Sequence, residues 1–162
     1  MARTLVIGYG NPSRQDDGAG LAVVNDLRGR LGLPALEEGD DGGADLGAGL
    51  DTLFLQLLSP ELAETLAGYD HVAFVDAHTG AIQELVHRTP LEPRPGASMA
   101  SHHMKPSQLL ALTVQLYGRA PTSELISIRG YDFDFGSTLS PATQEGVRAV
   151  AGDIWRRHGP GD

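Results

Sequence analysis

The chain contains no cysteine among its 162 residues. This absence excludes disulfide bonds, thiolate metal ligands and a cysteine nucleophile. Long apolar runs are also missing, and none approaches the roughly 20 residues that a membrane-spanning helix needs. The first apolar run is reached by Thr4, which leaves no room for a signal peptide. We therefore expect a cytoplasmic protein with no membrane segment.

Basic residues are few, with 12 Lys and Arg against 21 Asp and Glu, and the formal net charge is -9. Such a surface repels nucleic acid, so we expect no nucleic-acid partner. Part of the negative charge lies in residues 37–41 (Glu-Glu-Gly-Asp-Asp), within a glycine-rich stretch that runs to Gly49. Holding carboxylates in one geometry on such a flexible backbone is costly. The pattern predicts a solvated loop rather than a metal site.

The length and a hydrophobic content of 41% indicate a single domain that spans residues 1–162. Strand patterns alternate with helix patterns along the chain. We predict strands over residues 5–7, 51–58, 71–76, 81–88 and 125–128, and helices after residue 18, over 59–67, from 106 and over 141–157. The helix at 59–67 would be capped by Ser59, and residues 89–96, with three prolines, would be irregular. This alternation predicts an α/β fold in three layers, a mainly parallel twisted sheet with helices on both faces.

The loop after the first strand contains the residues that indicate which kind of ligand this domain would bind. Gly8 and Gly10 break the strand, and the adjacent carboxylates Asp16 and Asp17 precede the next helix. In this chain, Ser13 stands where the dinucleotide-binding pattern G-x-G-x-x-G has its third glycine. Carboxylates at a helix start would also repel a phosphate, so both features disfavour a nucleotide-binding loop. Asp is a common helix N-cap residue, which accounts for one carboxylate but not for both.

Three polar residues are expected to meet at one edge of the sheet. Asp17 follows the first strand, Asp76 ends the third, and His102 precedes the third helix. The carboxyl ends of parallel strands share an edge, and two carboxylates with an imidazole suit a divalent first-row metal. Asp76 could instead cap a turn, and His102 and His103 could be surface residues. His78 could be a further ligand. Ser-His-Asp catalysis is formally possible, but the sequence contains no G-x-S-x-G motif, the turn that carries the nucleophilic serine in α/β-hydrolases.

Three stretches occur in a recognisable order. They are Leu-Val-Ile-Gly-Tyr-Gly-Asn-Pro with Asp-Asp-Gly-Ala-Gly in residues 5–20, Phe-Val-Asp-Ala in 74–77, and Ser-His with Pro106 and a leucine pair in 101–110. Residues 129–141 fall where a last strand and a C-terminal helix would lie. This arrangement, over almost the whole chain, resembles the maturation endopeptidases of nickel-iron hydrogenases.

The resemblance implies a single α/β domain and an enzyme, a nickel-recognising endopeptidase. Its partner would be the hydrogenase large-subunit precursor, whose C-terminal extension is removed once nickel has been inserted. Asp17, Asp76 and His102 would contact that nickel, which the precursor supplies, so the enzyme would need no resident metal. The bound metal would polarise the scissile carbonyl or lower the pKa of an attacking water.

Three features depart from the family pattern. Asp17 stands where the family often has Glu, and residues 56–60 replace a glycine-threonine turn found in many members. The tandem His102-His103 leaves the choice of ligand open, with the spacing to Leu109 favouring His102. The alternative hypothesis is a non-catalytic metal-sensing or nucleotide-binding α/β domain.

Overall fold

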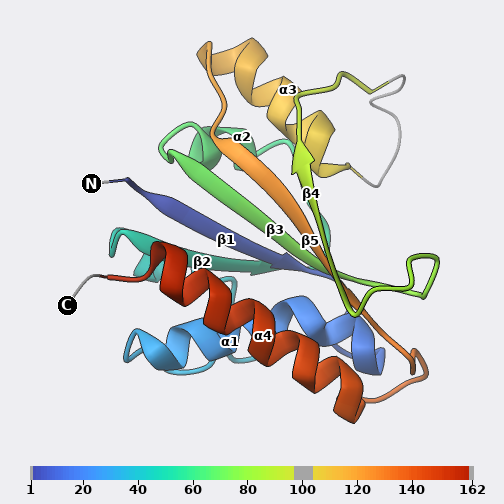
Figure 1. Ribbon diagram of the computed structural model, residues 1–162. Helices are drawn as coiled ribbons and strands as arrows, with labels where there is room; N and C mark the ends of the chain where they lie inside the picture. The colour runs from blue at the N-terminus through green and yellow to red at the C-terminus, as the bar shows by residue number, and fades with distance from the viewer. Residues whose placement is uncertain (1, 97–103, 161–162) are drawn as a thin grey trace.

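A twisted five-stranded sheet forms the centre of the computed structural model, which describes residues 2–96 and 104–160 (Figure 1). The strand order is β2-β1-β3-β5-β4. The first four of these, β2 (Leu50–Leu55), β1 (Thr4–Tyr9), β3 (His71–His78) and β5 (Thr122–Arg129), are parallel, and the edge strand β4 (Val86–Leu91) is antiparallel to β5. The predicted mainly parallel sheet is confirmed.

Helices cover both faces, as the sequence predicts. Helices α1 (Ala19–Arg30) and α4 (Pro141–His158) lie on one face, and α2 (Leu62–Leu66) and α3 (Pro106–Tyr117) on the other (Figure 1). Successive strand residues point to opposite faces. Val6 is therefore buried under α1 and α4, whereas Leu5 and Ile7 are buried under α2 and α3. Burial on both faces explains the nearly continuous apolar character of this strand.

Several predicted elements have different bounds in the structure, where β1 continues through Gly8 to Tyr9 and β3 continues past Asp76 to His78. The strand predicted over 81–88 begins at Val86 and continues to Leu91, into the stretch predicted to be irregular. Pro90 is tolerated there because β4 is an edge strand that pairs only with β5. The helix predicted from Ser59 begins at Leu62, its N-cap is Glu61, and no side chain caps it. The Leu62 N–H donates to the Ser59 carbonyl oxygen and closes a turn there instead. Strand β2 ends at Leu55 rather than at residue 58.

The connection between α1 and β2 is largely irregular, with one short 3-10 helix at Gly43–Asp45. Residues 37–41 are exposed or nearly so, which confirms the predicted solvated loop. In residues 2–96 and 104–160, no helix is both long and apolar enough to cross a membrane.

The strand order makes the carboxyl ends of β1 and β3 a topological switch point. The chain leaves β1 for β2 on one side and reaches β3 on the other, and open α/β sheets bind ligands at such a switch point. Two glycines let α1 begin close to these strands. A Cβ on Gly20 would lie 2.7 Å from the Val75 carbonyl oxygen, and one on Gly8 would lie 2.3 Å from the Gly20 carbonyl oxygen. This close packing holds the loop before α1 beside the carboxyl ends of β1 and β3.

Candidate functional site

Asp76 lies near the end of β3 and is held by side chains from both neighbouring strands. The Tyr9 hydroxyl on β1 donates to Asp76 Oδ2 at 2.9 Å, and the Ser127 hydroxyl on β5 donates to Oδ1 at 2.7 Å. Strand alternation puts all three on the face covered by α2 and α3. Each carboxylate oxygen accepts one of these bonds and keeps a further lone pair for a ligand.

Burial raises the pKa of Asp76, and the negative charge of Asp17 raises it further. The hydrogen bonds from Ser127 and Tyr9, together with His78, act in the opposite direction without cancelling the rise. Burial and the Asp76 charge also raise the pKa of Tyr9, which keeps its hydroxyl protonated as a donor. A cation bound near both carboxylates would reduce the repulsion that Asp17 exerts on Asp76.

Asp17 lies in a 3-10 helix, Gln15–Gly18, that links β1 to α1. Its Oδ2 accepts the Asn11 N–H at 2.8 Å. Gly10 has a φ of +134°, and a Cβ there would lie 2.5 Å from the Asp17 carbonyl oxygen, so the loop folds tightly around Asp17. A phosphate bound at this loop would need N–H donors such as that of Asn11. The contact to Asp17 thus favours the carboxylate interpretation over the nucleotide one.

Asp16 has a different role, although it precedes Asp17 directly. It is fully buried and accepts four hydrogen bonds, from the N–H groups of Tyr131, Asp132 and Ser140 and from the Ser140 hydroxyl. Burial by itself would raise the pKa of Asp16, but these bonds lower it to about 2. Asp16 therefore anchors the loop between β5 and α4.

The capping interpretation of these two carboxylates is wrong. The N-cap of α1 is Gly18, and no side chain caps that helix. The role of Asp16 escaped sequence reasoning because its donors lie 115 to 124 residues further along the chain.

The histidine ligand predicted at His102, and its alternative His103, lie outside the described residues, so this assignment stays a prediction. Helix α3 follows them, and it begins on the side of the sheet toward which β1 and β3 run (Figure 1). Met104 packs against the apolar cluster on the same face of the sheet as Asp76.

His78 is disfavoured as a further ligand because both of its ring nitrogens are engaged. Its Nδ1 accepts the Gly80 N–H at 3.2 Å, and its Nε2 lies 3.2 Å from the Glu84 carbonyl oxygen. We assign the proton to Nε2 on the basis of these two partners. Residues 2–96 and 104–160 contain no group of three or more His, Asp or Glu side chains placed to hold a metal. Any metal bound by Asp17 and Asp76 would need a ligand from elsewhere.

Comparison with known proteins gives matches in structure alone. No family model matches the chain, and no curated protein matches its sequence. The NiFe hydrogenase maturation protease HycI from Thermococcus kodakarensis KOD1 has 19% identity and a TM-score of 0.63, with 96% of this chain and 91% of that chain covered. The hydrogenase maturating endopeptidase HybD from E. coli has 17% identity and a TM-score of 0.64, with 97% and 94% covered.

A third match extends the range of source organisms. The hydrogenase 2 maturation peptidase from Thaumarchaeota archaeon SCGC_AB-539-E09 has 21% identity and a TM-score of 0.59, with 97% of this chain and 98% of that chain covered. All three similarities run along nearly the whole of both chains. The chain therefore has the fold of the NiFe hydrogenase maturation proteases.

Proposed function

We propose that this protein is an endopeptidase that removes the C-terminal extension of a nickel-loaded hydrogenase large-subunit precursor. The observation that carries the proposal is the Asp76 carboxylate, held by Tyr9 and Ser127 at the switch point of a maturation-protease fold. The similarity of fold supports the general activity. The nickel and the precursor come from the sequence resemblance and from the chemistry of these carboxylates.

In this proposal the nickel belongs to the substrate and reports that the precursor is ready to be cut. Asp17 and Asp76 would contact the ion through their remaining lone pairs, and His102 would supply the nitrogen ligand. Nickel held there would polarise the scissile carbonyl or lower the pKa of an attacking water. Tyr9 and Ser127 fix the orientation of the Asp76 carboxylate, one on each oxygen. The Asp76 side chain would therefore already be in the rotamer that contacts the ion.

The test is the intact mass of each hydrogenase large-subunit precursor from the source organism after incubation with this protein, with and without nickel. We expect a C-terminal peptide to be lost only from the nickel-loaded precursor. Asp17→Asn and Asp76→Asn should each slow cleavage by about 100-fold or more, because each removes a charged ligand. Asp134→Asn is the matched control, since Asp134 is exposed on the loop after β5 and should cut at the normal rate.

Two further variants test which of the two histidines is the nickel ligand. His102→Gln should abolish nickel-dependent cleavage, whereas His103→Gln should preserve it. Equal cleavage with and without nickel would exclude nickel recognition. If no precursor loses mass, the protein is a binding domain, and the non-catalytic alternative gains support.

A further inference from the structure

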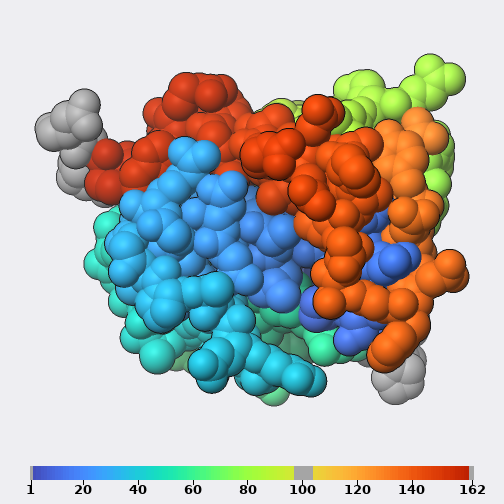
Figure 2. Space-filling model, turned by 90° about the horizontal axis from the view of Figure 1, so that it is seen from below, coloured from blue at the N-terminus to red at the C-terminus, as the bar shows by residue number. Residues whose placement is uncertain are grey.

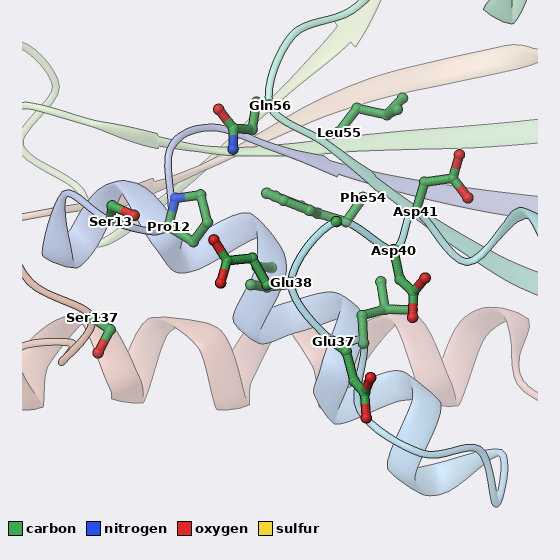
Figure 3. Close-up of a pocket in the computed structure, with 13 residues that line it drawn as sticks. Pro12, Ser13, Glu37, Glu38, Asp40, Asp41, Phe54, Leu55, Gln56 and Ser137 are labelled. Carbon is green, nitrogen blue, oxygen red and sulfur yellow. The ribbon is translucent and has the colours of Figure 1, made fainter.

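A groove of about 550 Å³ is lined in part by Pro12 and Ser13, which lie in the loop between β1 and Asp17 (Figure 3). Three segments far apart in the sequence form most of it: the loop after β1, the loop at residues 36–41, and the end of β2. Its lining includes an apolar part, which we call the floor, formed by Leu21, Leu36 and Phe54, with Leu55 at its edge. In Figure 3 the Phe54 ring extends toward Pro12, so the floor reaches the loop that carries Asp17.

The rim of this groove is acidic. Glu37, Glu38, Asp40 and Asp41 line it, and its lining contains no lysine or arginine among the described residues. Within the same part of the chain, the carboxylates of Glu37, Glu38 and Asp40 form no ion pair. No ion pair therefore neutralises these three carboxylates, and they give the groove a negative potential.

The acidic loop has a defined position because both of its ends are tied to the fold. The Leu36 N–H donates to Asn25 Oδ1 of α1 at 2.9 Å. The Phe54 N–H of β2 donates to the Asp41 carbonyl oxygen at 2.9 Å, and the Asp41 carboxylate accepts the Gly43 N–H at 2.7 Å. Figure 2 shows this segment, in cyan, lying beside α1 at the surface. The rim is thus fixed relative to the floor.

We propose that this groove binds an extended polypeptide segment in which lysine or arginine side chains stand beside apolar ones. The apolar side chains would cover the floor and the cations would face the rim, since charge complementarity favours this occupant over an acidic or phosphorylated one. The volume suits several side chains. Pro12 and Ser13 line the groove next to Asn11, which bonds Asp17, so a bound segment leads to the candidate site. If the proposed function is right, this segment belongs to the hydrogenase precursor.

The direct test uses a fluorescein-labelled nonapeptide that alternates arginine and leucine, with fluorescence anisotropy as the measurement. The groove variant Glu37→Gln/Glu38→Gln/Asp40→Asn removes three charges and keeps Asp41, which shapes the turn. The matched control Glu64→Gln/Glu92→Gln/Glu145→Gln removes three charges from exposed sites outside the groove.

We expect the groove variant to bind the peptide about tenfold more weakly, and the control variant within about twofold of the parent. A glutamate-leucine peptide and an arginine-serine peptide should both bind more weakly than the arginine-leucine one. The first has no cations for the acidic rim, and the second has no apolar side chains for the floor. Equal losses in the two variants would show an effect of net charge alone and overturn the proposal. Equal binding of all three peptides would also overturn it.

Cleavage of the nickel-loaded precursor separates this inference from the proposed function. We expect the groove variant to raise KM with little change in kcat, whereas Asp76→Asn lowers kcat. Unchanged KM in the groove variant would refute the groove as a substrate site while the function stands. Selective peptide binding without cleavage of any precursor would refute the proposed function while the groove stands.

Discussion

Asp16 and Asp17 are neighbours with opposite expected roles, and replacing each by asparagine separates them. The Asp16→Asn side chain would keep one acceptor oxygen for the four donors that Asp16 now satisfies. Each buried donor left without a partner costs about 1–3 kcal/mol. The pKa gives a similar figure, since its lowering from 3.8 to about 2 corresponds to roughly 2.5 kcal/mol. We expect Asp16→Asn to lower the free energy of unfolding by about 2–4 kcal/mol.

Asp17→Asn should cost less than about 1 kcal/mol, because one asparagine oxygen suffices for the single N–H of Asn11. The assay is urea unfolding at pH 7 of the parent and both variants, with Asp134→Asn as an exposed control. The reasoning is refuted if Asp16→Asn loses less than about 1 kcal/mol, or if the two variants lose equal amounts.

The same carboxylate predicts a pH dependence. The folded-state pKa of Asp16 is depressed, so its contribution is complete above the unfolded-state value of 3.8 and is lost as the pH falls toward about 2. The stability difference between the parent and Asp16→Asn should therefore shrink between pH 4 and pH 2. A difference that stays constant over this range would contradict the assignment of a depressed pKa.

Two further predictions concern β1 and α1, which lie beside the site. Tyr9→Phe removes one donor to Asp76 and should reduce precursor cleavage about tenfold, measured by intact mass, with a loss of stability near 1 kcal/mol; unchanged cleavage would show that Tyr9 does not position Asp76. Gly20→Ala should cost about 2 kcal/mol or more in urea unfolding, because its Cβ would lie 2.7 Å from the Val75 carbonyl oxygen. Gly29→Ala, in the same helix with open space around it, should instead stabilise by about 0.5–1 kcal/mol, and equal effects would refute the close-packing argument.

The sequence by itself determined the class of fold and the elements that carry the site. The apolar run of the first strand, the helix beginning after Gly18 and the carboxylate near the end of β3 are all local patterns, and the structure has each of them, although β1 continues through Gly8 to Tyr9. Local patterns work there because strand burial and turn geometry depend on residues a few positions apart. They failed where tertiary context outweighed them, as at Pro90, which only an edge strand accepts.

Only the tertiary structure decided what each polar side chain does. Asp16 and Asp17 are adjacent residues of the same type, yet Asp16 anchors a distant loop, whereas Asp17 accepts the Asn11 N–H in its own loop. Tyr9 and Ser127 meet Asp76 because strand order places β1 and β5 on either side of β3, across separations of 67 and 51 residues. The acidic loop is the rim of a groove because the fold brings residues 36–41 beside the loop after β1 and the end of β2. Hydrogen bonds and charges act through space, so the partner of a side chain follows from the order of strands in the sheet and not from its neighbours along the chain.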